Sequence, residues 1–191
     1  MRSTTQQEKK QRALEFLILL LLGASDNKIS LLHFEKEVFL LWNFHPDIKE
    51  FVSFISHYRG PYSKEIEEII KNPFYLVDCW KYIPPKRNDL ISGGFVELTP
   101  QGRSKYKIVY ADSLKNQKMI PLLSAFKMVR EMYDKLTLEE LLLLIYDSYP
   151  EYRKKSNVYE TIHKSRQIIA EKLKKEGFID EERYQTLIAS T

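Results

Sequence analysis

The chain of 191 residues carries a formal net charge of +4, with 43% hydrophobic and 29% charged residues. A chain of this length and hydrophobic content can build one core or two small ones, which excludes a disordered protein. The single cysteine, Cys79, excludes an internal disulfide framework and a cysteine-rich zinc site, and it fits a reducing, cytoplasmic location.

The first expected element is a helix over residues 8–22 that becomes almost entirely apolar toward its end. Basic residues precede the apolar run at 16–22, as they do in a signal peptide. However, Glu15 adjoins the run, and its seven residues fall far short of the roughly 18 residues of a membrane span. We therefore interpret this helix as the centre of a core and expect no membrane partner.

A second helix is expected to begin after Ser30, which has the side chain of an N-cap. Its apolar residues recur at helical spacing and comprise Leu31, Phe34, Val38, Leu41 and Trp42. The charged residues Glu35, Lys36 and Glu37 are expected on the other, polar side. Pro46 ends or interrupts this helix. Residues 48–58 fit either a helix or a strand, and their aromatic content and the Gly-Pro pair that follows favour an extended segment.

A short helix over residues 64–71 is expected next, with Ser63 as its N-cap. Three isoleucines of this helix fall on one face, namely Ile66, Ile69 and Ile70. The Asn-Pro pair at 72–73 ends the helix, because the residue before a proline is disfavoured in helical conformation.

A β-hairpin and a helix start follow. A strand, a basic loop and a returning strand make up the expected hairpin, at residues 74–83, 84–89 and 95–98. Thr99 with Pro100 behind it predicts the beginning of a helix that reaches about residue 109. The order of these elements predicts a mainly α fold with a small antiparallel β-hairpin, in which residues 1–110 form a winged helix-turn-helix domain.

The remainder, residues 111–191, is expected to be a helical C-terminal domain. Its expected helices lie at residues 118–135, from Thr137 to about residue 149, at 156–176, and in a short last segment. Thr137 and Glu140 have the spacing of a capping box, and Gly177 closes the long helix. The apolar stripes on these helices are either core or a dimer interface, so this domain is a candidate dimerisation element of a homodimer.

Residues 81–107 contain six basic and two acidic residues. The net charge of this stretch, +4, equals the net charge of the whole chain. A solvated surface explains such a run as well as a binding surface does. In a winged helix, the third helix approaches the major groove of double-stranded DNA and the hairpin reaches the phosphate backbone. The predicted nucleic-acid-binding residues are Arg59, Tyr62, Ser63, Lys64, Lys71, Lys86, Arg87, Arg103 and Lys105.

Two segments carry a family resemblance: HFEKEVFLL at residues 33–41 and YRGPYSKEI at residues 58–66. They resemble a group of archaeal and bacterial winged-helix regulators with a Tyr-Gly-Pro-Tyr-Ser turn, and more distantly the SocA-like (Panacea) antitoxin domains. The first group also has a Leu-Thr-x-x-Gly helix start and a Tyr-Pro-Glu-Tyr motif, which stand here at residues 98–102 and 149–152. The resemblance implies a regulator or an antitoxin-like binding protein, and it points to no catalytic residue.

No catalytic or metal site emerges from the sequence. Cys79 falls inside an expected strand, whereas a nucleophile needs a neighbouring base and an exposed, electropositive setting. The chain has no Gly-rich phosphate loop and no serine nucleophile elbow, and its four histidines lack the paired spacing of a metal site. We therefore expect no enzyme activity, no metal and no cofactor.

Two hypotheses from different classes remain. The first is a transcriptional regulator that contacts DNA phosphates through the Ser63 helix and the basic wing. The second is an antitoxin-like or adaptor module that uses the same domain to hold a protein partner. Glu67 and Glu68 favour the second, because carboxylates on the short helix would face phosphate poorly.

Overall fold

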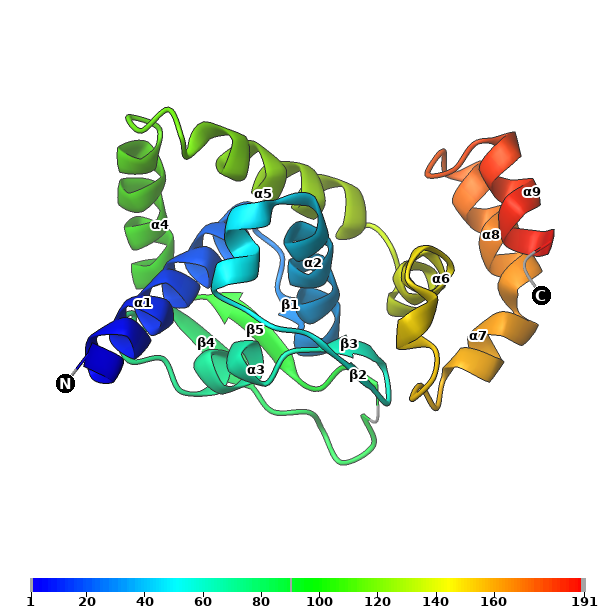
Figure 1. Cartoon of the computed structure of the whole chain (residues 1–191), viewed down its shortest axis with the longest axis horizontal. Helices are drawn as coiled ribbons and strands as arrows, with labels where there is room; N and C mark the ends of the chain where they lie inside the picture. The colour runs from blue at the N-terminus through cyan, green and yellow to red at the C-terminus, as the bar shows by residue number, and fades with distance from the viewer. Residues whose placement is uncertain (1, 90, 190–191) are drawn as a thin grey trace. The chain divides into compact units, whose positions relative to one another are not determined.

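The computed structural model describes residues 2–89 and 91–189, and it confirms a mainly helical protein with small antiparallel sheets (Figure 1). The described chain divides into two compact units. The first comprises Met1–Phe54 and Ser63–Asp134, and the second comprises Ile55–Tyr62 and Lys135–Thr191. The chain therefore leaves the first unit after Phe54, contributes a short segment to the second, and returns at Ser63.

The first unit contains a three-stranded antiparallel sheet. Its strands are β1 (Ile29–Ser30), β5 (Phe95–Leu98) and β4 (Trp80–Ile83), in that order. Val96 of β5 pairs with residues on both neighbouring strands and is fully buried. The two-residue strand β1, which the sequence did not predict, thus completes a sheet rather than leaving a lone hairpin.

Three helices come before the hairpin of this sheet. They are α1 (Arg2–Gly23), α2 (Leu31–Phe44) and α3 (Lys64–Lys71), with the 3₁₀ turn η1 (Pro46–Glu50) after α2. The serines predicted as N-caps accept hydrogen bonds from the first turns of α2 and α3. The order α1–β1–α2–α3–β4–β5, with β5 between the other two strands, is the topology of a winged helix.

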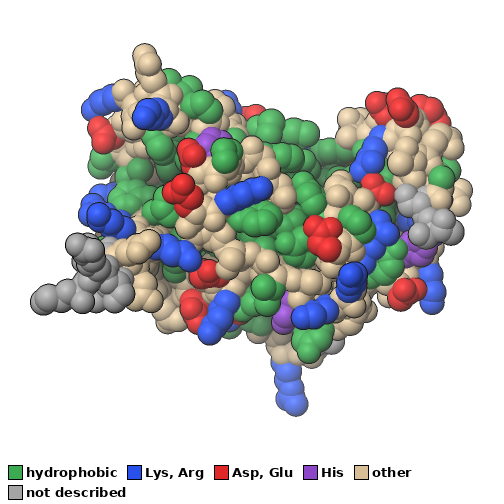
Figure 2. Space-filling model, in the orientation of Figure 1, with side chains coloured by type: hydrophobic (Ala, Val, Ile, Leu, Met, Phe, Trp, Pro, Cys, Tyr) green, Lys and Arg blue, Asp and Glu red, His purple; other side chains and the backbone are tan. Residues whose placement is uncertain are grey.

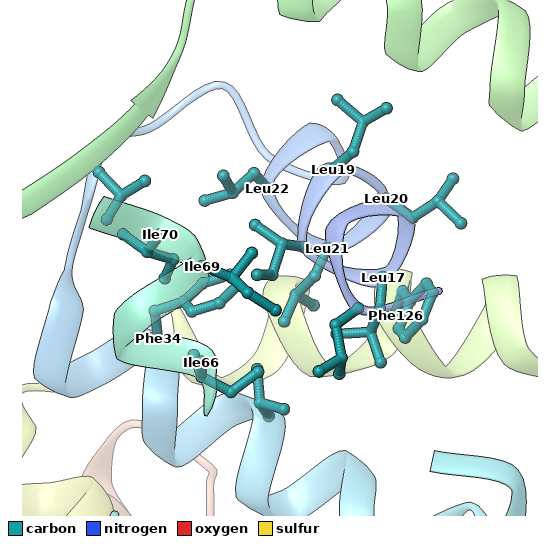
Figure 3. Packing of buried hydrophobic residues seen from close by; sticks show 14 of the residues in the cluster. Leu17, Leu19, Leu20, Leu21, Leu22, Phe34, Ile66, Ile69, Ile70 and Phe126 are labelled. Atoms are coloured by element: carbon teal, nitrogen blue, oxygen red, sulfur yellow. The ribbon is translucent and has the colours of Figure 1, made fainter. Parts of the chain in front are cut away.

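The core of the first unit forms where the apolar end of α1 meets α2, α3 and α5. Figure 3 shows Ile66, Ile69 and Ile70 of α3 beside Phe34 of α2, to the left of the leucines of α1. Full burial of one such side chain stabilises the fold by about 1.5–3 kcal/mol. Among the described residues, no helix has the length and apolar character needed to cross a membrane.

Helix α4 (Pro100–Ser113) begins where the sequence places it. The Thr99 hydroxyl accepts a hydrogen bond from the Gly102 N–H at 3.0 Å. A Cβ atom at Gly102 would lie 1.6 Å from the Cys79 carbonyl oxygen, so only glycine permits this approach of helix to strand. The helix runs four residues beyond the predicted end at residue 109.

Helix α5 (Ile120–Tyr133) belongs to the first unit, because it packs on α1 and α2 and buries Phe126 and Val129 among their side chains. The first unit consequently extends to Asp134. This division differs from the predicted boundary at residue 110, since the apolar face of α5 is core and not a separate domain.

The second unit begins with the hairpin of β2 (Ile55–His57) and β3 (Gly60–Tyr62). This hairpin packs on α6 (Leu138–Ser148) and on η2 (Pro150–Tyr152). The capping box of Thr137 is present, with hydrogen bonds in both directions between Thr137 and Glu140.

The extended segment expected over residues 48–58 is extended only in its last part, because η1 occupies its beginning.

The rest of the second unit is a series of short helices, α7 (Tyr159–Lys164), α8 (Arg166–Lys175) and α9 (Glu181–Ala189). The prediction of one helix over residues 156–176 is wrong, because the backbone leaves helical geometry at Ser165. Gly177 adopts a φ of 77° after α8, as a closing glycine does.

The strand predicted over residues 74–83 is also wrong in its first half, since β4 covers only Trp80–Ile83. The buried carboxylate of Glu15 accepts hydrogen bonds at 2.7–2.8 Å from three successive N–H groups, those of Phe74, Tyr75 and Leu76. These donors are then no longer free to pair with a strand. Asp78, with a φ of 66°, turns the chain just before β4.

The charged face predicted for α2 lies in the core instead of on a polar side. Glu35, Lys36 and Glu37 are all at most 1% exposed. Lys36 lies 3.4 Å from Glu35, and Arg130 of α5 donates a hydrogen bond to Glu37 at 3.0 Å. Buried charges need such partners.

Candidate nucleic-acid interface

The wing is the loop between β4 and β5, described at residues 84–89 and 91–94, and hydrogen bonds hold its base. The Asp89 carboxylate accepts hydrogen bonds from the N–H groups of Ile91 and Ser92, at 3.1 and 2.8 Å. The returning arm is tied to the first turn of α2, where Leu31 N–H donates to the Gly94 carbonyl at 2.9 Å. The Tyr82 hydroxyl also donates to this arm, at the Gly93 carbonyl. A wing on such a base can present its tip in a fixed position.

Lys86 and Arg87 form the tip of the wing, and both are exposed. The structure gives their side chains no ion pair with any residue it describes. In Figure 2 a basic side chain projects at the lower edge of the view, where Figure 1 places this loop. Lys81, lower on the same hairpin, is instead paired with Glu97 at 2.6 Å. The tip therefore carries two positive charges that remain available to an anion.

The N-terminus of α3 is already occupied by the protein itself. Ser63 is buried, and its hydroxyl accepts the Ile66 N–H at 3.4 Å. The Glu65 carboxylate is partly buried, which opposes its ionisation. Hydrogen bonds from its own N–H, from Ser53 and from Lys10 outweigh that cost and lower its pKa. An acidic side chain thus stands where the sequence predicted a DNA phosphate.

The two lysines of α3 are paired with carboxylates of the same helix. Lys64 lies 3.3 Å from Glu68, and Lys71 pairs with Glu67. This hydrogen bond to Glu67 raises the pKa of Lys71. With Glu65 included, the helix carries three carboxylates and two ammonium groups. Its own charges therefore oppose phosphate.

One end of α3 lies against the hairpin. The Lys71 ammonium sits 5.5 Å from the centre of the Tyr82 ring, and the Trp80 indole donates to the Ile70 carbonyl at 3.1 Å. These contacts involve the C-terminal end of the helix. Ser63 is at the other end, about 12 Å away at 1.5 Å per residue. The structure thus brings Lys71 to the hairpin but not Ser63.

Arg103 and Lys105 lie at the opposite end of the sheet from the wing tip. They follow β5, whose last residue, Leu98, pairs with Trp80 at the start of β4. Arg103 donates at 3.2 Å to the carbonyls of Gly23 and Ser25, and so fixes the end of α1. Lys105 is exposed. The prediction that both assist the wing therefore lacks support from the geometry.

Arg59 and Tyr62 belong to the hairpin of the second unit. The Tyr62 ring stacks on His57, with 4.7 Å between ring centres, and both side chains are half-buried. The neighbouring turn is held by Asn157, whose N–H donates to the Tyr58 carbonyl at 2.9 Å. The stacking on His57 gives Tyr62 a place in the packing of that unit.

A buried charged cluster between α2 and α5 escaped the sequence reasoning. Arg130 bridges Glu37 and Asp134, each at 3.0 Å, and the His33 imidazole lies 3.0 Å from the Tyr133 carbonyl. Burial raises the pKa of Glu37 to about 8, although Arg130 opposes the shift, and burial lowers the pKa of His33. The one sign of this cluster in the sequence was the presence of charged residues on a helix that was expected to be partly buried.

Cys79 lies in a setting that does not favour a nucleophile. The thiol of Cys79 is buried, and burial raises its pKa, which disfavours the nucleophilic thiolate. Within the described parts of the chain, no group of three or more His, Cys, Asp or Glu residues is placed to hold a metal ion.

The chain matches no protein-family model and no curated protein.

Proposed function

We propose that the first unit is a DNA-binding winged helix that contacts the phosphate backbone of double-stranded DNA mainly through its wing. The observation that carries the proposal is the pair of exposed, unneutralised cations Lys86 and Arg87 at the tip of a firmly held hairpin. Phosphate contacts provide affinity without reading sequence, so the wing accounts for binding and not for specificity. A cytoplasmic transcriptional regulator is the role that fits this activity, in line with the resemblance of the GPYS turn.

The test is a titration of duplex DNA over a series of salt concentrations. Each phosphate contact adds about 0.9 to the slope of log K against log salt, so Lys86→Ala with Arg87→Ala should flatten the slope by about 1.8. The same variant should lose about tenfold in affinity at low salt.

Two double variants serve as matched controls, since each removes the same charge from another part of the first unit. Lys105→Ala with Lys107→Ala acts on α4, and Lys64→Ala with Lys71→Ala acts on α3. Both should change the slope by less than the wing variant does. Binding without salt dependence, or equal losses in all three variants, would contradict the proposal.

A protein-holding module, antitoxin-like or adaptor in kind, is the second candidate. The observation that favours it is the acidic character of α3, whose carboxylates pair with its only lysines. This candidate predicts DNA binding that is weak and does not saturate, with no difference between the wing variant and its controls.

A homodimer would present two wings to two DNA half-sites, which is how many winged-helix regulators recognise half-sites at a fixed separation. We infer such an arrangement for DNA binding. Light scattering of the free protein and of its complex with a duplex tests it, with two chains per duplex as the expected result and one chain as the contrary result.

A further inference from the structure

A groove runs between α1 and α3 on the first unit. It encloses about 710 Å³, and its lining comprises Gln7, Glu8, Lys10, Gln11, Leu14, Glu65, Glu68, Ile69 and Asn72. The lining residues follow helical spacing over two turns of each helix, so one face of α1 and one face of α3 border the space. Ile69, which is 8% exposed, and the fully buried Leu14 lie at the bottom of the groove, where the core of the first unit begins. A groove of this form suits a short amphipathic helix.

An exposed aromatic segment adjoins one end of this groove. Phe74, Tyr75 and Val77 are 69, 38 and 52% exposed, directly after the groove residue Asn72. The groove residue Gln11 donates to Glu15 at 3.2 Å, and Glu15 holds the N–H groups of this segment. Large apolar side chains held in solvent by a buried carboxylate mark a contact surface.

Charge selects among the possible occupants of the groove. Three carboxylates, those of Glu8, Glu65 and Glu68, and the ammonium of Lys10 border it. Glu65 pairs with Lys10 at 3.4 Å and Glu68 pairs with Lys64 at 3.3 Å, which leaves the Glu8 carboxylate in excess. A phosphate backbone would meet net negative charge here. A segment with lysine or arginine beside its apolar residues would meet complementary charge.

We propose that the groove between α1 and α3, together with the aromatic segment, is a docking site for a cationic amphipathic helix of a partner protein. The apolar residues of that helix lie over Ile69 and against the exposed Phe74. Its basic residues face Glu8 and Glu68. The wing lies beyond the other end of β4, so a partner in the groove leaves Lys86 and Arg87 free. The site thus adds a protein contact that is independent of DNA binding.

The experiment uses the full chain and three synthetic peptides of equal length. The first is an amphipathic leucine–lysine helix, the second has glutamate in place of lysine, and the third keeps lysine but has serine in place of leucine. Backbone amide shifts in NMR spectra locate each peptide on the protein, and fluorescence anisotropy gives its affinity.

We expect only the leucine–lysine peptide to bind, with shifts confined to the α1 and α3 ridges and the segment after Asn72. Glu8→Gln with Glu68→Gln should weaken it by about three- to tenfold, as two rim charges do. The control Asp112→Asn with Glu131→Gln removes two exposed carboxylates elsewhere on the first unit and should change nothing.

Absence of binding, equal binding of the glutamate peptide, shifts outside the groove, or equal weakening by the control would each overturn the proposal. The DNA titration separates this outcome from the proposed function. Glu8→Gln with Glu68→Gln should not reduce DNA affinity, whereas the wing variant should not reduce peptide affinity.

Discussion

Two short charged runs of the first unit have opposite fates. Residues 35–37 of α2 lie in the core, paired with each other and with a helix almost a hundred residues later in the chain. Lys86 and Arg87 stand in solvent at the tip of the wing. Charge in a sequence therefore does not locate a surface, because burial depends on whether the fold brings a partner to the charge.

The same comparison separates structural cations from available ones. Arg130 and Arg103 both have partners within the first unit. Arg130 pairs with Glu37 and Asp134, and Arg103 contacts two backbone carbonyls and the carboxylate of Asp26. The cations of the wing have no such partner among the described residues. Mutations should accordingly act on stability in the first case and on DNA binding in the second.

The largest expected effect is on stability. Arg130→Met leaves Glu37 and Asp134 without their buried partner and should lower the free energy of unfolding by about 3–5 kcal/mol. Urea unfolding followed by circular dichroism measures it. Adding Glu37→Met should recover part of the loss, since no carboxylate at that position is then left uncompensated. A single variant as stable as the parent chain would contradict the described pairing.

The pH dependence of stability should follow the buried run. Burial raises the pKa of Glu35 to about 7 and that of Glu37 to about 8, from an ordinary 4.5. The folded protein then holds protons that the unfolded chain releases. Between pH 5 and about 7, the free energy of unfolding should therefore fall as pH rises, by at most about 1.4 kcal/mol per pH unit for each group.

Glu35→Gln with Glu37→Gln should flatten this dependence, because the amides cannot release a proton. Glu131→Gln is the matched control, since that carboxylate is exposed. Urea unfolding at several pH values gives the slope for each variant. If the double variant kept the pH slope of the parent chain, these two carboxylates would not be the cause of the pH dependence.

A smaller effect is expected at Arg103. Arg103→Met removes the donors that hold the carbonyls of Gly23 and Ser25, and should cost about 1–2 kcal/mol of stability. Its salt slope for DNA binding should match that of the parent chain. A salt slope reduced by about 0.9 would instead show that Arg103 contacts a DNA phosphate, as the sequence predicted.

The smallest effect is expected on the surface of α3. Lys64→Ala breaks an exposed pair with Glu68 and should change the free energy of unfolding by less than about 0.5 kcal/mol. Thermal unfolding measures it, with Glu68→Ala as the reciprocal variant. A much larger cost would show that this pair is not merely a surface contact.

Local signals in the sequence predicted much of the fold. The caps at Ser30, Ser63, Thr99 and Thr137 all begin helices, because each needs only a side chain and the turn that follows it. The order of these helices and the hairpin was enough to predict the winged helix. Strand β1 was missed since two residues have no periodicity to detect.

Two of the errors have a long-range cause. The strand predicted over residues 74–83 lost its first half to Glu15, about sixty residues earlier in the chain. The polar side of α2 became core through Arg130. At the candidate site, exposure of the wing cations followed from a loop of polar residues, but the internal use of Arg103 and Glu65 depended on partners that no local pattern reveals.

The hairpin at Ile55–Tyr62 has a consequence for how this protein is made. Its partners in α6 and η2 lie about eighty residues further along the chain, so they leave the ribosome long after the hairpin does. The first unit must therefore fold while residues 55–62 still lack the helices on which they pack. A fragment that ends at Asp134 would contain the hairpin without α6 and η2. A fragment that begins at Lys135 would contain α6 and η2 without the hairpin.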